Sequence, residues 1–266
     1  MIVRGGNDIA TAVAHRLHRT GFAVLVLEDP VPRAVRLRMA FAAAVLGGNV
    51  VVEGCRAVRV ETLDEGVEVI ARRAALPVLV DPAGTALGAW RPDVVVDARL
   101  TKREPPATST RDAPLVVGLG PGFTAGVNCH VAVETNRGPG LGRIIWAGST
   151  DAYTGQPETI EGHGRDRYLY APVAGLFETV RKIGDVVEDG DVVGRVGDTP
   201  LVAMVGGIIR GIAPSGRLVP AGRKLVDIDP RRDSARVSTL SDKAWTVAES
   251  VEQLLSGRRS PRRRDR

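Results

Sequence analysis

A glycine turn near the N-terminus has the residue types and spacing to bind an anion. Gly5, Gly6, Asn7 and Asp8 follow a short apolar run and precede residues whose apolar positions repeat at helical spacing. A strand, a glycine turn and a helix N-terminus together present backbone N–H groups to a phosphate. Glu28 ends the next apolar run, where an acid can bind a ribose hydroxyl. These residues predict nucleotide or phosphate binding; the alternative is the tight turn that any α/β protein needs here.

A second glycine loop is the next candidate for ligand binding. Gly118, Gly120 and Gly122 follow the apolar run Leu115–Val117, and Pro121 stiffens the loop between them. Glycines without side chains let the backbone approach a ligand closely. We predict that this loop shares a ligand with the first turn. A crowded crossover between packed elements would explain the same glycines.

Acidic residues end four of the expected strands, at Glu28, Asp81, Asp97 and Glu134. Ligands of open parallel sheets bind at the carboxyl ends of the strands. If these strands are neighbours, the acids share one rim and could bind ribose hydroxyls or Mg²⁺, or act as a general base. The simpler interpretation of any one of them is that an acid stops a strand.

A polar loop that follows Asp97 adds further candidates. Lys102, Arg103 and Arg111 could place positive charge against a phosphate. Asp97, Lys102 and Asp112 are the candidate catalytic residues, although no spacing singles out one of them.

No metal site is expected from the sequence. His15 and His18 are three residues apart on one predicted helix, but no third ligand lies near them in the sequence. We therefore expect both to be exposed histidines on a helix surface.

Composition excludes several classes of protein. The chain has 266 residues and a net charge of +5, and its last ten residues hold six Arg and one Asp, so the other residues are neutral overall. This charge distribution predicts no specific nucleic-acid partner. The longest apolar stretch, Met39–Val52, is shorter than the ~20 residues of a membrane-spanning helix. Two cysteines fit a reducing compartment, so we expect a cytoplasmic protein without membrane attachment.

The pattern of apolar runs predicts an α/β fold with two domains. Apolar strands alternate with helical stretches over residues 1–165, which is typical of a mostly parallel, Rossmann-like sheet. From residue 166 to 256 we expect a small β domain with a C-terminal helix. Within it Ala171–Gly175 is echoed by Ala203–Gly207, an offset of 32 residues that indicates a duplicated unit. Residues 257–266 are expected to form a disordered Arg-rich tail.

The duplicated part resembles the biotinyl/lipoyl carrier domain, which is a barrel-sandwich hybrid. The matching marks are Ala171-Pro172-x-x-Gly175 and Gly184-Asp185-x-Val187-x-x-Gly190-Asp191. Members of that family attach their cofactor to a lysine at the tip of a hairpin. The corresponding turn here, Arg195–Pro200, has no lysine. The resemblance therefore implies a structural or docking module rather than a carrier.

Over about residues 1–256 the chain resembles the YqeB-type accessory proteins of selenium-dependent molybdenum hydroxylases. The motifs that carry this resemblance are Val3-Arg4-Gly5-Gly6-x-Asp8-x-Ala10, Pro77-Val78-Leu79-Val80-Asp81-Pro82, Pro92-Asp93-Val94-Val95-Val96-Asp97-Ala98, Gly118-Leu119-Gly120-Pro121-Gly122-Phe123-x-Ala125-Gly126, Glu134-Thr135-x-Arg137-Gly138, Thr154-Gly155-x-Pro157 and Asp227-Ile228-Asp229-Pro230. It implies a Rossmann-like domain and a role in maturing a molybdenum enzyme that carries a selenium-containing cofactor. Asn7 departs from the family's glycine-rich pattern, and no catalytic residue is carried over.

Three functions follow as expectations. The first is an accessory factor that binds a small phosphate ligand, such as a nucleotide or molybdopterin dinucleotide, and partners a molybdenum hydroxylase or its cofactor-maturation proteins. The second is an NAD(P)-dependent oxidoreductase that uses Gly5, Gly6 and Glu28. The third is a non-enzymatic adaptor that docks a molybdenum enzyme through the β domain.

Overall fold

The computed structural model describes residues 1–101 and 107–259, and it divides the chain into two compact units. The first unit comprises residues 1–32, 41–153 and the segment from Leu240 onward; the second comprises residues 33–40 and 154–239. Lys102 and Arg103 lie outside the described residues, as do residues 260–266 of the predicted tail, whereas residues 257–259, which were also expected in the disordered tail, form the end of a helix.

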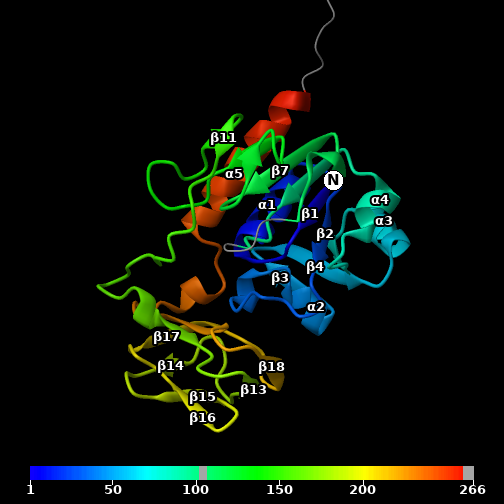
Figure 1. Cartoon of the computed structure of the whole chain (residues 1–266). Coiled ribbons are helices and arrows are strands. Elements are labelled where there is room, and N and C mark those ends of the chain that lie inside the picture. The colour runs from blue at the N-terminus through cyan, green and yellow to red at the C-terminus, as the bar shows by residue number, and fades with distance from the viewer. Residues whose placement is uncertain (102–106, 260–266) are drawn as a thin grey trace, which may run out of the picture. The chain divides into compact units, whose positions relative to one another are not determined.

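A nine-stranded sheet organises the first unit (Figure 1). From one edge to the other its strands are β10 (Ile144–Ile145), β9 (Val131–Val133), β7 (Leu115–Leu119), β6 (Val94–Asp97), β1 (Ile2–Arg4), β2 (Leu25–Glu28), β5 (Leu76–Val80), β4 (Cys55–Val60) and β3 (Asn49–Val52). The edge strands β10 and β3 pair antiparallel with their neighbours, whereas the seven strands between them are parallel. The predicted α/β class with a mostly parallel sheet is confirmed.

The order of the central strands indicates where a ligand site would lie in this sheet. Along the run β5-β2-β1-β6-β7-β9, the chain builds outward from β1 in one direction and then returns to β6 on its other side. This is the strand order of doubly wound sheets that bind dinucleotides; such sheets bind ligands at the strand ends where the order reverses, which here is between β1 and β6.

Helices pack on both faces of this sheet. They are α1 (Asp8–Arg19), α2 (Ala43–Gly47), α3 (Leu63–Arg72), α4 (Thr85–Trp90) and α5 (Asp242–Arg259), with short 3₁₀ turns η1 (Leu37–Met39), η2 (Thr110–Asp112), η3 (Arg165–Arg167) and η4 (Ser234–Val237). Figure 1 shows α1 and α5 together on one side of the strands and α3 and α4 on the other. A two-stranded ribbon, β8 (Thr124–Ala125) with β11 (Gly148–Ser149), completes the unit. Among the described helices, none has both the length and the apolar character needed to cross a membrane.

The terminal helix α5 belongs to the first unit, whereas we expected it with the second. It packs along α1, and the buried faces of the two helices, which include Val13, Leu17, Ala248 and Val251, cover each other. Arg16 of α1 adds ion pairs to Glu249 and Glu252 of α5. The second unit also begins earlier than the expected boundary at residue 165, at residue 154. The apolar side of α5 is buried against the first unit, mainly against α1. Burial of this apolar surface therefore holds α5 on the first unit.

Two four-stranded antiparallel sheets form the second unit. One contains β12 (Tyr168–Tyr170), β19 (Lys224–Asp229), β17 (Gly207–Ile212) and β14 (Val186–Val187), and the other contains β16 (Thr199–Val202), β15 (Val192–Val196), β13 (Gly175–Glu178) and β18 (Arg217–Val219). Buried side chains from both sheets form one core, in which Phe177, Ile209 and Leu225 are fully buried.

Residues 33–40 join the second unit although they come from the first third of the chain. The Val35 carbonyl accepts a hydrogen bond from the Ile212 backbone at 3.0 Å. A Cβ on Gly211 would lie 3.0 Å from the Val35 carbonyl and from the Arg36 side chain, so the close approach requires glycine at this position.

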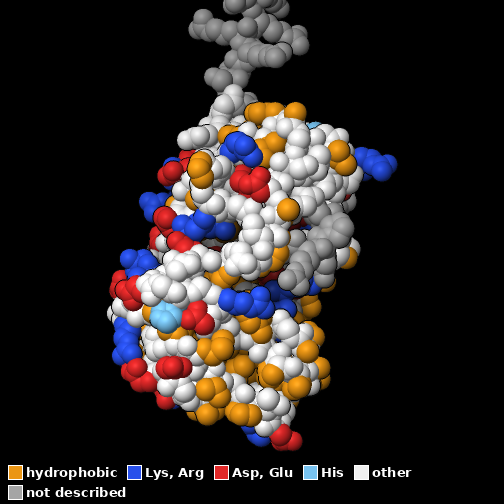
Figure 2. Space-filling model, turned by 60° about the vertical axis from the view of Figure 1, so that its left-hand side comes forward, with side chains coloured by type: hydrophobic (Ala, Val, Ile, Leu, Met, Phe, Trp, Pro, Cys, Tyr) orange, Lys and Arg blue, Asp and Glu red, His pale blue; other side chains and the backbone are white. Residues whose placement is uncertain are grey.

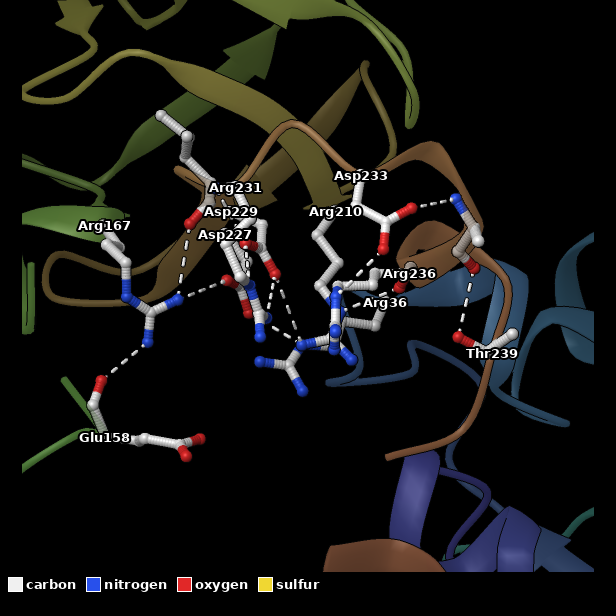
Figure 3. Close-up of polar contacts among 12 residues, drawn as sticks. Arg36, Glu158, Arg167, Arg210, Asp227, Asp229, Arg231, Asp233, Arg236 and Thr239 are labelled. Carbon is white, nitrogen blue, oxygen red and sulfur yellow. Dashed lines mark hydrogen bonds and ion pairs between the residues drawn. The ribbon is translucent and has the colours of Figure 1, made fainter. Parts of the chain in front are cut away.

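A buried ionic cluster holds these segments together (Figure 3). Asp227 is fully buried on β19, and its Oδ2 accepts from Arg36 Nε at 2.7 Å and from Lys224 Nζ at 2.8 Å. Arg167, itself 1% exposed, lies 3.7 Å from the other carboxylate oxygen. Burial alone would raise the pKa of Asp227, but Arg36 and Lys224 lower it well below its usual range. The carboxylate is therefore charged, and it links three separate parts of the chain.

His15 was expected to be exposed, but the packing of α5 on α1 buries it to 4% exposure. Its Nε2 lies 3.2 Å from the Glu53 carbonyl oxygen, and its ring packs edge-on against Trp245 with centroids 5.2 Å apart. Its Nδ1 is buried with no hydrogen-bond partner among the described residues. Burial therefore lowers the pKa of His15, because a second ring proton would have no acceptor.

The first prediction concerns pH. Because the pKa of His15 is lower in the folded state than its ordinary 6.5, the unfolded chain takes up a proton first as the pH falls. The free energy of unfolding should therefore decrease as the pH falls below about 6.5. Urea denaturation between pH 8 and pH 5 measures this slope. His15→Gln should show a smaller slope, with a remainder from His18, whose pKa burial also lowers. Equal slopes in both proteins would contradict the assignment to His15.

Candidate functional site

The carboxyl ends of β1 and β6 meet at the point where the strand order reverses. Arg4 and Asp97 are direct neighbours in the parallel register of these strands. Gly5, with φ +101°, approaches so closely that a Cβ there would lie 3.1 Å from both the Ala98 carbonyl oxygen and Arg99 Cα. The Asn7 side-chain amide donates to the Ala98 carbonyl at 2.7 Å. This close approach fixes the two strand ends relative to each other.

Protein groups already occupy the donors of the first glycine turn. The Gly6 N–H donates to Glu28 Oε2 at 2.6 Å. Asn7 caps α1, and its Oδ1 accepts from the backbone N–H groups of Ile9 and Ala10 at 3.0 and 3.1 Å. The backbone N–H groups of Gly5, Gly6, Ile9 and Ala10, on which a phosphate would depend, are thus hydrogen-bonded within the protein. Asp8, in the first turn of α1, also has a partner.

Gly6 is close to backbone rather than to an open crevice. A Cβ on Gly6 would lie 2.7 Å from the Ala42 backbone nitrogen, and that nitrogen donates to the Gly6 carbonyl at 2.9 Å. The segment after residue 40 therefore covers this turn. Glycine is needed here for close packing of the chain on itself.

Asp81 caps α4. Its carboxylate accepts from the backbone N–H groups of Gly84, Thr85 and Ala86 and from the Thr85 hydroxyl, at 2.8–3.1 Å. Burial alone would raise the pKa of Asp81, but these hydrogen bonds lower it below its usual value. The acid is charged and stabilises the helix N-terminus.

Glu134 and Asp112 also have local structural partners. Glu134 is fully buried and accepts from the backbone N–H groups of Thr135, Asn136 and Asp151, each at 2.7 Å. Asp112 closes a capping box at η2 with Ser109. Arg111 is exposed on the same turn.

The second glycine loop is crowded by its neighbours. A Cβ on Gly118 would lie 2.1 Å from the Phe123 ring. Gly120 has φ +83°, and a Cβ there would lie 2.6 Å from Thr135 Oγ1. Gly122 has φ +90°. These glycines are explained by backbone conformation and close packing at the end of β7, as the crossover alternative expects.

At the reversal point Asp97 pairs with Arg99, and Arg4 joins the same cluster through Thr108. Asp97 is 1% exposed and forms a bidentate pair with Arg99, with Arg99 Nη2 at 2.6 Å from Oδ2 and Nε at 3.1 Å from Oδ1. The Thr108 hydroxyl donates to the same carboxylate. Arg4 is 5% exposed, and its Nη1 donates to the Ala107 carbonyl at 3.0 Å and to Thr108 Oγ1 at 3.3 Å.

The hydrogen bonds among the described residues use only part of the donors of Arg4 and Arg99. A guanidinium carries five N–H groups. Among the described residues, Arg4 donates through Nη1, and Arg99 donates through Nε and Nη2 to Asp97, Ala107 and Thr108, so these hydrogen bonds do not use Arg4 Nε and Nη2 or Arg99 Nη1. Burial lowers the pKa of Arg4, and the charge of Arg99 lowers it further, while Asp97, Asp112 and Asp81 oppose both effects. Spare donors on a buried cation are what a bound anion would satisfy.

Leu100, directly after Arg99, adds a strained backbone to this site. Its φ is +54°, a left-handed conformation that leucine rarely adopts. Strained residues of this kind cluster at ligand sites and switches. Guanidinium donors that the described hydrogen bonds do not use and a left-handed backbone conformation thus occur at the same strand ends.

Sequence reasoning found Asp97 but missed Arg4, Arg99 and Thr108 as site residues. The signal for Arg4 was present, because it is a charge at the end of the buried apolar run Ile2–Val3. Thr108 lies beyond a loop and carried no pattern. Among the described residues, no group of three or more His, Cys, Asp or Glu side chains could hold a metal ion.

These features define a mixed α/β protein with a large, mostly parallel sheet, a charged cluster at the reversal point and a separate β unit. The chain is 41% identical over 255 residues to the Escherichia coli (strain K12) protein named "Uncharacterized protein YqeB". The match covers 96% of this chain and 47% of that protein, so the chain spans about half the length of this relative. No protein-family model matches the chain.

Solved structures give weaker likenesses. The apo structure of the ectoine utilization protein EutE (DoeB) from Ruegeria pomeroyi is 14% identical, with 85% of each chain covered and a TM-score of 0.26. An aspartoacylase family protein from Mesorhizobium loti is 13% identical, with 77% of this chain and 55% of that chain covered and a TM-score of 0.25. At such TM-scores these likenesses support no conclusion about fold or function.

The second prediction tests the covered glycine turn. Gly6→Ala places a methyl group against the Ala42 backbone, so it should lower the free energy of unfolding by about 1–3 kcal/mol. Gly88→Ala on α4 is the matched control, since nothing lies within 4 Å of a Cβ there. The control should be neutral or stabilising by up to about 1 kcal/mol. Chemical denaturation measures both, and equal stability of Gly6→Ala and the parent protein would refute the contact.

The third prediction tests the shared carboxylate. Asp97→Asn removes the buried carboxylate that pairs with Arg99 and that also acts on the charge of Arg4, which should cost about 3–5 kcal/mol of stability. Asp198→Asn, on the exposed β15–β16 turn, should change stability by less than about 0.5 kcal/mol. Denaturant titrations give the free energy of unfolding of both variants. A decrease below about 1 kcal/mol for Asp97→Asn would contradict a structural role of the Asp97–Arg99 pair.

Proposed function

We propose that this protein is an accessory factor for the maturation of a selenium-dependent molybdenum hydroxylase. In this proposal it binds a phosphate-bearing ligand, a nucleotide or a pterin phosphate such as molybdopterin dinucleotide, at the carboxyl ends of β1 and β6. Its partners would be the hydroxylase or the proteins that mature its cofactor, in the cytoplasm. The motif resemblance supports the proposed role, and the 41% identity to the Escherichia coli protein named YqeB supports the resemblance itself.

The observation that carries the ligand proposal is the buried guanidinium of Arg4 with its spare donors. Arginine binds phosphate through paired N–H groups, and such charge-assisted hydrogen bonds are strong. Arg99 adds a second cation that Asp97 holds in place by a bidentate pair. Asp97 is then a positioning residue rather than a catalytic one. The glycine turn supplies close backbone packing, since its donors bind Glu28 and Asn7.

The proposal includes two finer assignments of architecture. The first unit is Rossmann-like, which the strand order around β1 supports. The second unit is a barrel-sandwich hybrid, which its two antiparallel sheets and shared core support. Its turn between β15 and β16 lacks a lysine, so in this proposal the unit is a structural or docking module.

The oxidoreductase alternative receives less support from the geometry. A nicotinamide dinucleotide would use the N–H groups of the first turn and the carboxylate of Glu28. These groups are hydrogen-bonded to each other, with Gly6 N at 2.6 Å from Glu28 Oε2. Binding there would require both to exchange partners.

The fourth prediction tests the ligand site. Native mass spectrometry with ADP, CMP, NAD⁺ and molybdopterin dinucleotide should identify a ligand, and calorimetry should give its affinity. Arg4→Gln should weaken binding by about 10- to 100-fold, the effect of losing charged hydrogen bonds. Arg56→Gln, an exposed arginine on β4, is the matched control and should bind like the parent. Binding that survives Arg4→Gln unchanged, or no binding to any member of the panel, would refute this site.

The cellular role is tested separately. Deletion of the gene should abolish the activity of the client molybdenum hydroxylase, and a plasmid copy should restore it. Arg56→Gln should restore activity fully and Arg4→Gln weakly. Full hydroxylase activity in the deletion strain would overturn the accessory role, whatever the outcome of the binding experiment.

A further inference from the structure

One sheet of the second unit has an exposed apolar outer face. More than half of the large hydrophobic side chains that are exposed in the described chain lie in this unit, and Figure 2 shows hydrophobic side chains gathering over it. In the sheet β16-β15-β13-β18, Leu218 is 81% exposed and Val192 58%. The inward-facing residues of the same strands, such as Phe177 and Val193, are buried in the core. An exposed face of this kind marks an interaction surface.

The register shows how this face is laid out. Leu176 lies directly opposite Leu218, and Val192 lies directly opposite Val202, so two apolar pairs stand at different levels of the sheet. Between them runs a polar row in which Glu178 is paired with Arg195, at 2.8 Å between Glu178 Oε2 and Arg195 Nη2. We call this surface, formed by these six residues, the outer face.

We propose that the outer face binds a second copy of this chain, forming a twofold dimer. A twofold axis that lies above the outer face, parallel to β13 and β15 and over the line midway between them, places each of these strands over the other strand of the second copy. It therefore places Glu178 of one copy over Arg195 of the other, and Arg195 over the other copy's Glu178. The charges of the outer face are thus complementary to those of the same face in a second molecule, as a twofold interface requires.

The same twofold axis also lets the apolar residues of the outer face pack without a steric clash. Leu176 is level with Gly197 at the β15–β16 turn, since the Gly197 N–H donates to the Leu176 carbonyl at 2.9 Å. In the dimer, Leu176 of one copy then faces Gly197 of the other, where there is no side chain to clash. Apolar contacts at both levels surround the two central ion pairs and exclude water from them. This inference is independent of the proposed ligand and of the proposed cellular role.

The fifth prediction uses charge reversal on the full-length chain. Sedimentation velocity should show a dimer of the parent protein at micromolar concentration. Glu178→Arg alone and Arg195→Glu alone should each weaken the dimer by about 10-fold or more, because like charges then face each other. An equimolar mixture of the two variants should form a heterodimer, since one copy then carries two arginines and the other two glutamates. This recovery cannot arise from a folding defect.

Two further variants complete the test. Glu188→Arg reverses a comparable exposed ion pair with Arg232, outside the outer face, and should leave the dimer unchanged. Leu218→Glu should weaken the dimer without loss of fold, because this side chain is already 81% exposed. A parent protein that stays monomeric, or a dimer that withstands both charge reversals and Leu218→Glu, would overturn the proposal. Failure of the mixed variants to associate would overturn the proposed axis.

Discussion

The first unit depends on the burial of one guanidinium at the end of its central strand. Arg4 is the last residue of β1, which pairs with β2 on one side and β6 on the other. This position in the middle of the sheet leaves Arg4 95% buried. A buried cation is tolerated when counter-charge and acceptors surround it. Asp97 supplies the charge, and Ala107 and Thr108 supply acceptors for one nitrogen. Ala107 and Thr108 are thereby held at the strand ends, next to Arg4.

The second unit uses the same device for a different purpose. Asp227 is a buried carboxylate surrounded by cations from three segments, and Asp229 nearby forms a bidentate pair with Arg231. Substituting one member of such a cluster lowers stability strongly, because the remaining members stay buried and charged without their partner. Replacing the whole cluster by apolar residues would cost less. The cluster therefore fixes residues 33–40 on the second unit. Buried charge thus organises the proposed ligand site in one unit and holds distant chain segments together in the other.

Much of the architecture could be predicted from the sequence, whereas the site could be predicted in part. Apolar runs such as Val94–Val96 identify buried parallel strands because continuous burial leaves a continuous pattern. The pattern cannot show that α5 packs on α1 or that residues 33–40 join the second unit, since both depend on contacts between distant segments. Glycine turns indicate close approach, but not whether backbone or ligand approaches. At Gly6 and Gly118 the neighbours are Ala42 and Phe123.

The most direct test of the central claim is a crystal structure of the protein with its phosphate-bearing ligand bound. The account predicts phosphate oxygens within hydrogen-bond distance, about 2.7–3.2 Å, of Arg4 Nη2 and Arg99 Nη1. In that structure the Gly6–Glu28 hydrogen bond should remain intact. A ligand phosphate bound at the N-terminus of α1, with Glu28 displaced from Gly6, would contradict the account.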